Sequence, residues 1–560
     1  DWGVIGVFFL ALIGIIVWVV RQKQNDSADY FLGGRDATWL AIGASIFASN
    51  IGSEHLIGLA GAGASSGMAM AHWEIQGWMI LILGWVFVPF YSRSMVYTMP
   101  EFLERRYNPQ SRTILSVISL VSYVLTKVAV TVYAGGLVFQ QVFGIKELWG
   151  IDFFWIAAIG LVVLTALYTI FGGMKSVLYT SVLQTPILLL GSLIILVLGF
   201  KELGGWDEMM RVCGAVTVND YGDTMTNLIR SNDDANFPWL GALIGSAIIG
   251  FWYWCTDQFI VQRVLSGKNE KEARRGTIFG AYLKLLPVFL FLIPGMIAFA
   301  LHQKYIGAGG EGFLPMLTNG TANADAAFPT LVAKLLPAGV KGLVVCGILA
   351  ALMSSLASLF NSSAMLFTID FYKRFRPETP EKKLVGIGQI ATVVIVILGI
   401  LWIPIMRSVG DVLYTYLQDV QSVLAPGIAA AFLLGICWKR TSAQGGMWGL
   451  IAGMIIGLTR LGAKVYYSNA GEVADSTFKY LFYDMNWLFF CGWMFLFCII
   501  VVIVVSLATE APTAEKIQGL VFGTATKEQK AATRASWDHW DIIHTVIILA
   551  ITGAFYWYFW

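Results

Sequence analysis

Long hydrophobic stretches alternate with short polar ones along almost the whole chain. Most hold about 20 residues, the length that a helix rising 1.5 Å per residue needs to cross about 30 Å of hydrocarbon. Lipid cannot satisfy an open sheet edge, so the crossing segments must be helical. The pattern predicts an all-α polytopic membrane protein with about 14 transmembrane helices. The predicted spans are residues 3–20, 38–60, 68–91, 113–142, 151–171, 176–199, 238–262, 276–301, 338–370, 384–405, 410–437, 445–466, 480–507 and 540–560.

The composition also indicates that lipid is the outer solvent. Of 560 residues, 57% are hydrophobic and 13% are charged, about half the charged fraction of a soluble domain. A net charge of +2 gives no basic field for nucleic acid. The six cysteines follow no metal or disulfide spacing, which favours the plasma membrane of a bacterium, the inner membrane. The first stretch, 3–20, is long enough to stay as a span rather than be removed as a signal peptide.

Basic residues gather in alternate loops between the predicted spans. Loops 92–112, 263–275 and 372–383 are rich in Lys and Arg. Loops 201–237 and 303–337 are rich in Gly and Asp and hold about a third as many basic residues. The positive-inside rule places the first set in the cytoplasm, so both termini are predicted to be extracellular or periplasmic.

Two predicted spans contain polar residues where a membrane helix should be apolar. Residues 47–67 include Asn50, Glu54 and His55, and residues 250–263 include Asp257. Ionisable groups inside a span are costly and usually face a cavity or a partner. Two interrupted helices in comparable positions of two halves indicate a transporter with inverted repeats that binds its solute near the midplane.

The same first segment also carries the glycines Gly58, Gly61 and Gly63. Small residues inside a span allow helices to pack closely. We interpret these three glycines as packing positions rather than as part of a binding site.

Several long motifs stand out along residues 30–507. They are DYFLGGR (29–35), ASNIGSEHLIGLAG (48–61), TMPEFLERRY (98–107), WYWCTDQFIVQRVLSGKN (252–269), LMSSLASLFNSSAMLFTIDFY (352–372) and FLLGICWKR (432–440). They resemble the sodium/glucose cotransporters, within the wider solute:sodium symporters, and in particular their glucose/galactose-type members. The resemblance implies a LeuT-like core of two five-helix inverted repeats.

The resemblance further implies how the chain is divided. The expected segments are an extra N-terminal helix (1–21), inverted repeat 1 (38–199), an external loop (200–237), inverted repeat 2 (238–437), two C-terminal helices (438–508), a cytoplasmic linker of unknown role (509–539) and a last transmembrane helix (540–560).

A sugar site needs hydrogen-bonding groups around a ring of hydroxyls and an aromatic plane against the apolar face. The resemblance implies seven substrate-binding residues, which are Asn50, His55, Glu74, Tyr253, Trp254, Lys284 and Gln418. It also implies an outer gate of Leu59, Trp73 and Tyr414, while Tyr253 closes the site toward the cytoplasm.

These residues also have simpler interpretations. Lys284 could extend its amine to the membrane surface, or it could form a structural ion pair with Glu74. His55 alone would be typical of helix packing, and Trp73 and Tyr414 could be core or interface aromatics.

Sodium prefers oxygen ligands, including carbonyls freed where a helix unwinds. Ala351, Ser354 and Ser355 share one helix face, being spaced i, i+3 and i+4. The resemblance pairs them with the carbonyls of Ala48 and Ile51 in a five-oxygen sodium site. The alternative is that the two serines bond to their own helix.

A second sodium site is not expected. The family usually has Asp in the motif that reads YTSVLQT here, where Ser181 stands, and Ala357 replaces an expected hydroxyl. Loss of an anionic ligand inside the membrane weakens a cation site, so we predict one sodium per sugar.

These observations predict a sodium-coupled symporter of glucose or galactose that works by alternating access. We do not expect an enzyme, because no nucleophile–base or metal motif occurs in the sequence. We expect Na⁺ as the coupling ion, no organic cofactor, a small-molecule sugar as substrate, the bilayer as surroundings, no nucleic acid and a monomer as the functional unit. The alternatives are a symporter of another solute such as myo-inositol, a sugar-binding sensor or ion leak without concentrative uptake, and coupling to protons.

Overall fold

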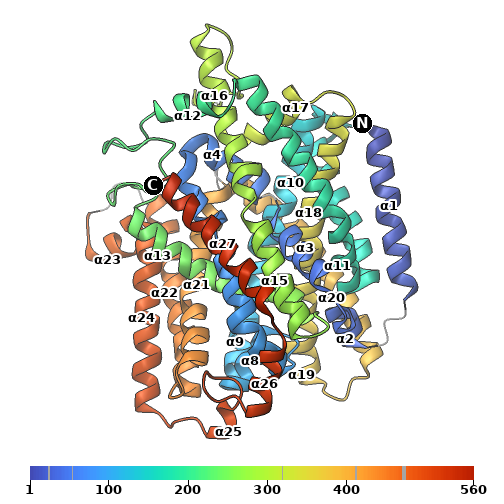
Figure 1. Ribbon diagram of the computed structural model, residues 1–560, viewed down its shortest axis with the longest axis vertical. Coiled ribbons are helices and arrows are strands. Elements are labelled where there is room, and N and C mark those ends of the chain that lie inside the picture. The colour runs from blue at the N-terminus through green and yellow to red at the C-terminus, as the bar shows by residue number, and fades with distance from the viewer. Residues whose placement is uncertain (23–25, 53, 318–319, 410–412, 470–473) are drawn as a thin grey trace.

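The computed structural model describes residues 1–22, 26–52, 54–317, 320–409, 413–469 and 474–560, and only the backbone of residues 124–126, 137, 141, 402–409, 413–419 and 468–469. The helices form one tall bundle (Figure 1), with α1 at one edge and α24 at the other. Both termini lie in the upper half of that view, on the side of α12, whereas α8, α19, α25 and α26 lie at the lower end.

The helices of the first half include short 3₁₀ or π-helical stretches, which are labelled η. They are α1 (Trp2–Arg21), α2 (Ser27–Leu32), η1 (Gly33–Arg35), α3 (Trp39–Asn50), η2 (Glu54–Leu59), α4 (Ala60–Ser66), η3 (Gly67–Met70), α5 (Ala71–Glu74), α6 (Gly77–Ile82), η4 (Leu83–Phe87), α7 (Val88–Ser94), α8 (Met99–Arg106), α9 (Pro109–Ser122), η5 (Tyr123–Val128), α10 (Ala129–Phe143), α11 (Phe153–Leu203) and α12 (Trp206–Gly214).

The second half also contains α-helices interrupted by short η stretches. Its helices are α13 (Trp239–Gly250), η6 (Phe251–Thr256), α14 (Gln258–Leu265), α15 (Glu270–Lys284), η7 (Val288–Leu292), α16 (Ile293–Gly307), η8 (Ala324–Ala326), α17 (Ala327–Leu335), α18 (Val340–Met365), η9 (Leu366–Tyr372), α19 (Lys373–Phe375), α20 (Glu381–Val409), α21 (Leu413–Cys437), α22 (Ala443–Asn469), α23 (Thr477–Lys479), η10 (Tyr480–Asp484), α24 (Trp487–Ala508), α25 (Ala514–Ile517), α26 (Lys527–Ala535) and α27 (His539–Tyr558).

The predicted all-α architecture is confirmed. Among the described residues, 11 helical stretches are long and apolar enough to cross a membrane, and Trp39–Asn50 and Ala129–Gln140 are shorter apolar helices. Gly173, with a φ of +53°, divides the 51-residue α11 where two predicted spans meet. Helices therefore lie in every predicted span. The strands found in the described part of the chain are β1 (Glu147–Leu148) and β2 (Ile151–Asp152), which form one small hairpin.

The two interruptions expected from the sequence are present. Helix α3 ends at Asn50, and Ile51 has extended dihedral angles (φ −77°, ψ 107°) before η2 begins. In the second half, Asp257 has extended angles (φ −76°, ψ 127°) between η6 and α14. Each break places polar backbone and side-chain groups in the interior of the bundle.

The first broken helix is held by different neighbours on its two sides. Its inner half, α3, packs along α15, α11 and α18, whereas its outer half, α4, packs against α16 and η8. A Cβ atom at Gly63 would overlap the carbonyl oxygen of Leu292, and one at Gly295 would overlap the carbonyl oxygen of Ala60. This backbone contact supports the interpretation of Gly63 as a packing position.

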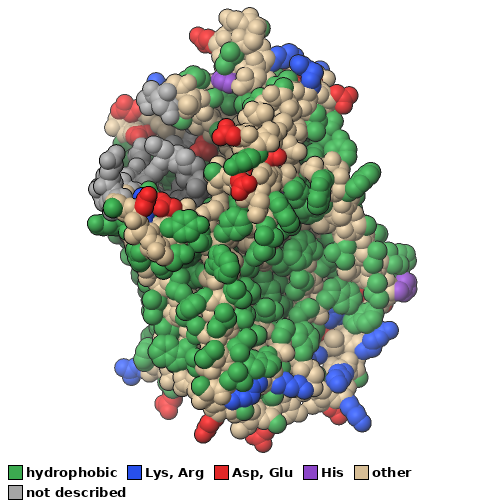
Figure 2. Space-filling model, turned by 90° about the vertical axis from the view of Figure 1, so that its left-hand side faces the viewer, with side chains coloured by type: hydrophobic (Ala, Val, Ile, Leu, Met, Phe, Trp, Pro, Cys, Tyr) green, Lys and Arg blue, Asp and Glu red, His purple; other side chains and the backbone are tan. Residues whose placement is uncertain are grey.

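The surface agrees with a bilayer environment. Figure 2 shows a broad hydrophobic belt with Lys and Arg side chains along its lower rim. That rim is the end at which α8, α19, α25 and α26 lie (Figure 1), so it contains two of the three loops predicted to be cytoplasmic.

Segment 509–539, whose role the sequence did not reveal, is packed against this end. The amide of Phe522 donates to the carbonyl oxygen of Ile436 at 2.8 Å, and the Phe522 ring meets Phe90 edge-on at 5.1 Å between centroids. Arg93 donates to Thr533 at 2.8 Å. The segment therefore ties the last helix to the loops around α7 and α21.

Candidate solute and sodium site

A small cavity lies between the two broken helices. Its volume is about 40 Å³, enough to hold water. The residues that line it are Asn50, Glu54, His55, Trp73, Glu74, Gln76, Ile249, Gly250, Tyr253, Trp254, Lys284 and Gln421. The interior of the bundle thus contains a polar site, built from segments far apart in the sequence.

A hydrogen-bonded network connects the polar walls of the cavity. Lys284 Nζ lies 2.5 Å from Glu74 Oε2 and 3.2 Å from Asn50 Oδ1. Glu74 Oε2 also lies 3.1 Å from His55 Nε2, and Asn50 Nδ2 donates to the hydroxyl of Tyr253 at 3.1 Å. The cavity is small because these side chains bond to one another across it.

Two buried nitrogen atoms at the cavity have no hydrogen-bond partner among the described residues. They are Nδ1 of His55 and Nε1 of Trp73. A buried polar group without a partner costs about 1–3 kcal/mol. A polar solute entering the cavity would give both nitrogens a partner.

Aromatic faces complete the site. The ring centroids of Tyr253 and Trp254 lie 4.9 Å apart at an interplanar angle of 85°, and Lys284 Nζ lies 5.3 Å from the Trp254 ring. Trp73 stacks on Trp487 at 5.5 Å between centroids. The site therefore offers an apolar plane beside a set of donors and acceptors.

The structure brings together six of the seven predicted solute-binding residues. These are Asn50, His55, Glu74, Tyr253, Trp254 and Lys284, all of which line the cavity. The predictions for Gln418 and for the gate residue Tyr414 lie outside the described side chains. Leu59 is buried but does not line the cavity, whereas Trp73 does.

The structure also decides between the interpretations of Lys284. Its side chain is 4% exposed and paired with Glu74, so it does not extend toward the membrane surface. The structural ion pair is present, and it lies in the wall of the cavity. The same pair can therefore serve both stability and binding.

Sequence reasoning missed two polar lining residues, Gln76 and Gln421, whereas Glu54 was expected to face a cavity or a partner. Gln421 follows Gln418 by three residues and so shares its helix face, a spacing that could have identified it. Gln76 donates to the Ser246 carbonyl at 2.8 Å and accepts from Trp254 Nε1 at 3.3 Å. Gln76 thereby holds the Trp254 ring in place.

A second buried ion pair lies next to Tyr253 and was also missed. Lys127 Nζ lies 2.7 Å from Asp257 Oδ2 and 4.8 Å from the centroid of the Tyr253 ring. Tyr123 donates its hydroxyl to the other carboxylate oxygen of Asp257. This pair fixes the break in the second helix against η5, on one side of the cavity.

One of the five predicted sodium ligands, Ser355, contacts the first break. Ser355 Oγ would be 3.1 Å from a Cβ atom at Gly52, so its hydroxyl lies directly against the unwound backbone. The amide of His55 bonds to the carbonyl of Gly52 rather than to that of Ile51, four residues back. Within the described part of the chain, Ser354 and Ser355 make no hydrogen bond to their own helix, which disfavours the alternative interpretation.

The position at which the family resemblance predicts an acidic residue carries a hydroxyl group, that of Ser181. Ser181 Oγ lies 3.3 Å from Ser354 Oγ and donates to the carbonyl of Val177 at 2.6 Å. Ser358 Oγ lies 2.6 Å from Ser49 Oγ. Ser354 therefore meets a neutral hydroxyl group at this position.

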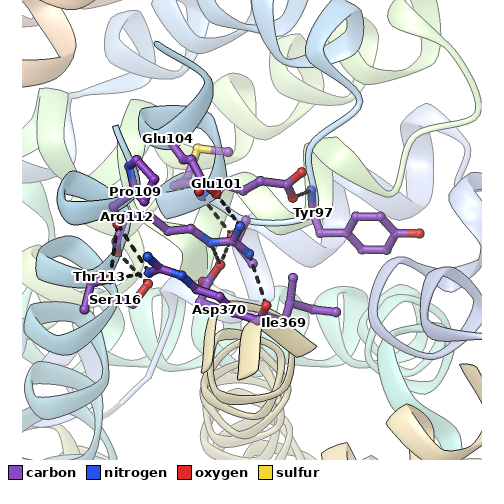
Figure 3. Close-up of polar contacts among 12 residues, drawn as sticks. Tyr97, Glu101, Glu104, Pro109, Arg112, Thr113, Ser116, Ile369 and Asp370 are labelled. Atoms are coloured by element: carbon purple, nitrogen blue, oxygen red, sulfur yellow. Dashed lines mark hydrogen bonds and ion pairs between the residues drawn. The ribbon is translucent and has the colours of Figure 1, made fainter. Parts of the chain in front are cut away.

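At the lower end of the bundle an ionic cluster joins three helical segments. Figure 3 shows Arg112 between Glu104 and Asp370. Its guanidinium lies 2.5 Å from Glu104 Oε2 and 2.7 Å from Asp370 Oδ1, and it donates to the carbonyl of Ile369 at 3.1 Å. Thr98 Oγ1 also donates to Asp370 Oδ1, at 2.8 Å. The cluster therefore links α8, α9 and η9.

Comparison with known proteins identifies the family to which the chain is similar. Residues 30–453 match the Sodium:solute symporter family. The chain is 36% identical over 538 residues to Sodium/myo-inositol cotransporter 2 of Homo sapiens, covering 94% of this chain and 79% of that protein. It is 37% identical over 547 residues to the Sodium/myo-inositol cotransporter of Canis lupus familiaris, covering 93% and 75%.

Solved structures show the same fold. One of a Na⁺-coupled sialic acid symporter in a substrate-bound outward-open state has a TM-score of 0.72 at 22% identity, covering 91% of this chain and 98% of that one. One of MhsT in complex with L-phenylalanine has a TM-score of 0.50 at 14% identity, covering 84% and 99%. The predicted LeuT-like fold is therefore confirmed.

Proposed function

The chain belongs to the sodium:solute symporter family, and we propose that its solute is a cyclic polyol of the myo-inositol type, with glucose and galactose as the second candidates. The observation that carries this proposal is the network of Lys284, Glu74, His55 and Asn50 across a cavity of about 40 Å³. A ring that bears neighbouring hydroxyls can accept from Lys284 and donate to Glu74 at once, replacing bonds that the side chains make to each other.

The choice of polyol rests on chemistry and on relatives. Myo-inositol carries a hydroxyl on every ring carbon, whereas a hexopyranose replaces one such position by a ring oxygen, which can only accept. The cavity offers acceptors as well as donors, and the relatives named above are myo-inositol cotransporters. These points favour inositol over the hexose that the sequence motifs alone suggested.

The proposed roles follow from position. Asn50, His55, Glu74, Lys284 and Gln418 bond the hydroxyls, and Tyr253 and Trp254 lie against the ring. Leu59, Trp73 and Tyr414 form the outer gate. Sodium is held by the carbonyls of Ala48, Ile51 and Ala351 and by the hydroxyls of Ser354 and Ser355, and its binding organises the break next to Asn50.

One sodium ion per solute is sufficient for accumulation. One charge crossing 100 mV contributes about 2.3 kcal/mol, and a tenfold sodium gradient adds about 1.4 kcal/mol. Together they support a solute gradient of a few hundred-fold. In this proposal a monomer built from inverted repeats 38–199 and 238–437 opens its site alternately to the two sides of a bacterial inner membrane.

The test is uptake into proteoliposomes of labelled myo-inositol, glucose and galactose, with inward sodium or potassium and a fixed membrane potential. We expect sodium-dependent myo-inositol uptake that exceeds equilibrium and is lost in Gln418→Ala. Ser355→Ala should raise the sodium concentration for half-maximal uptake about tenfold. Ser363→Ala, about two turns further along α18, is the matched control and should behave as wild type.

The alternative outcomes are distinct. Preferential hexose uptake would replace inositol by the second candidate. Solute binding without accumulation would indicate a sensor or leak. Uptake that persists when choline replaces sodium would indicate proton coupling and would refute the sodium site.

A further inference from the structure

The carboxylate of Glu74 is carried by a helix that is too short to hold its own position. Helix α5 is a single turn of four residues, Ala71–Glu74. It lies between the 3₁₀ turn η3 and the irregular backbone of Ile75 (φ −79°, ψ 24°) and Gln76 (φ −87°, ψ 25°). The end groups of a helix lack partners within it, so a single turn supplies little stability of its own. The position of Glu74 therefore depends on what contacts this turn from outside.

His72, two residues before Glu74, contacts two distant parts of the chain. Its side chain is buried. Its Nε2 lies 3.1 Å from the carbonyl oxygen of Leu228, and its Nδ1 lies 3.0 Å from the hydroxyl of Tyr556. The rings of His72 and Tyr556 are 5.5 Å apart between centroids. Helix α5 is therefore held between the loop that precedes α13 and the helix α27.

The two partners of His72 also fix the orientation of its ring. A carbonyl oxygen can only accept, so Nε2 carries the proton and donates to Leu228. In the neutral ring Nδ1 is then an acceptor, and Tyr556 donates its hydroxyl to it. The opposite tautomer would turn a lone pair toward the Leu228 carbonyl. The two bonds together therefore set the rotation of the imidazole as well as its place.

The loop that bonds to His72 is itself anchored on both sides. The amide of Leu228 donates to the carbonyl of Phe559, the residue that caps α27, at 3.1 Å. Earlier in the same loop, the carbonyl of Met225 accepts from the amide of Met68 at 2.8 Å. The loop, the segment before α5 and the end of α27 thus form one hydrogen-bonded unit.

Helix α27 is fixed along its length, so it can serve as a support for α5. It runs from α26 at the lower end to the C-terminus in the upper half of the bundle (Figure 1). Trp85 of η4 donates its indole N–H to Thr545 Oγ1 at 2.9 Å. Arg275 of α15 lies 2.7 Å from Asp538, which caps the helix at its start. Helix α27 lies outside the two predicted repeats and contacts the solute segment only through this support.

We propose that His72 is a positioning residue for solute binding. Tyr556 and the Leu228 carbonyl act through it, because they hold the α5 turn at the angle that directs Glu74 to Lys284. Loss of either bond frees the turn to rotate and moves the carboxylate away from the solute. The inference rests on the proposed function, since it concerns the affinity for the solute that Glu74 binds.

The test is the myo-inositol concentration for half-maximal uptake into proteoliposomes, measured together with the maximal rate and the melting temperature. Tyr556→Phe removes one hydroxyl and should raise this concentration about tenfold, the effect of one hydrogen bond of ordinary strength. The maximal rate, the melting temperature and the sodium dependence should stay as in the wild type. If the wild type prefers a hexose, the same comparison is made with that hexose.

Two substitutions of His72 distinguish its bonds from its bulk. His72→Gln keeps one donor and one acceptor at the end of the side chain, so its half-saturating concentration should stay near that of the wild type. His72→Leu removes both bonds and should have at least the effect of Tyr556→Phe. Tyr558→Phe, two residues further on α27 and 59% exposed, is the matched control and should change nothing.

The outcomes against the inference are specific. A lower melting temperature and maximal rate in Tyr556→Phe, at an unchanged half-saturating concentration, would show a contact that only stabilises the fold. Equal losses in His72→Gln and His72→Leu would show that the hydrogen bonds are not the cause. A wild type that takes up neither myo-inositol nor a hexose would refute the proposed function before any variant is measured, and the positioning role would fail with it.

Discussion

Two buried ion pairs, one at the cavity and one at the lower end of the bundle, differ in what surrounds them. Lys284 and Glu74 contact other side chains of the cavity, such as Asn50 and His55. Arg112 instead joins Asp370 to a backbone carbonyl, that of Ile369 (Figure 3). The first set of partners can be exchanged for solute hydroxyls, whereas the second is part of the framework.

The difference indicates where charge is needed for transport. A buried pair gives little net stability against an apolar replacement, but breaking it by removing one partner costs about 3–5 kcal/mol. If the lower cluster only holds helices together, an uncharged replacement of both partners should preserve transport. If the cavity pair binds solute, the same replacement should abolish transport.

The largest effect is expected from Lys284→Met. It removes the donor to Glu74 and Asn50, so we expect uptake to fall by at least about 100-fold, a loss of roughly 3 kcal/mol. The double variant Glu74→Gln with Lys284→Met should recover thermal stability in detergent without recovering uptake. Lys479→Met, which breaks an exposed pair with Asp475, is the control and should change neither quantity. Recovery of uptake in the double variant would contradict a role in binding.

The next effect is expected from Arg112→Met, which leaves Asp370 buried with only Thr98 as a side-chain partner. Stability should fall by about 3–5 kcal/mol, measured as a lower melting temperature. In Arg112→Met with Asp370→Leu, we expect melting temperature and uptake to return to within a few-fold of wild type. Arg211→Met, at the exposed pair with Glu208, is the matched control. A stable double variant without uptake would show that this cluster also takes part in transport.

The smallest effect concerns Asp325, a carboxyl with no cation beside it. It lies in the loop before α17 and against Gly61, and burial raises its pKa to about 6 from an ordinary value near 4. The folded state therefore disfavours the charged form. The contribution of Asp325 to the free energy of unfolding is most favourable below pH 4 and is lost as the pH rises through 6.

Asp325→Asn removes that titration, so it should stabilise the protein at pH 7.5 by at most about 3 kcal/mol and at pH 5 by about half as much. Melting temperatures at the two pH values measure the difference. Asp233→Asn, in another external loop, should give no gain. An equal gain at both values would show that charge is not the cause.

The sequence predicted the elements that depend on local composition. Spans follow from hydrophobic length, and both breaks follow from polar residues such as Asn50 and Asp257 inside apolar stretches. Glu74 and Lys284 could be placed at one site only through the family resemblance. The pattern of hydrophobic residues does not show that they lie together. The wider symporter family was predicted correctly, whereas the glucose-type assignment remains less well supported than its inositol alternative.

Pairings between distant segments could not be predicted in this way. Lys127 lies in a span that otherwise reads as an ordinary helix, and only the fold brings it to Asp257. Likewise, the residues of 509–539 are mostly polar, and nothing local indicates that Phe522 inserts beside Phe90. Such contacts depend on which surfaces the helices present to each other.

The backbone contact between α4 and α16 has a mechanical consequence. Because Gly63 and Gly295 leave no room for side chains between these helices, the outer half of the broken helix and α16 form one stiff lever. The inner half, α3, packs on other helices, which are α15, α11 and α18, so the two halves belong to different packing units. A bulky residue at either glycine would push the two helices apart and impair their joint movement. Every residue proposed to bind solute or ion would stay unchanged.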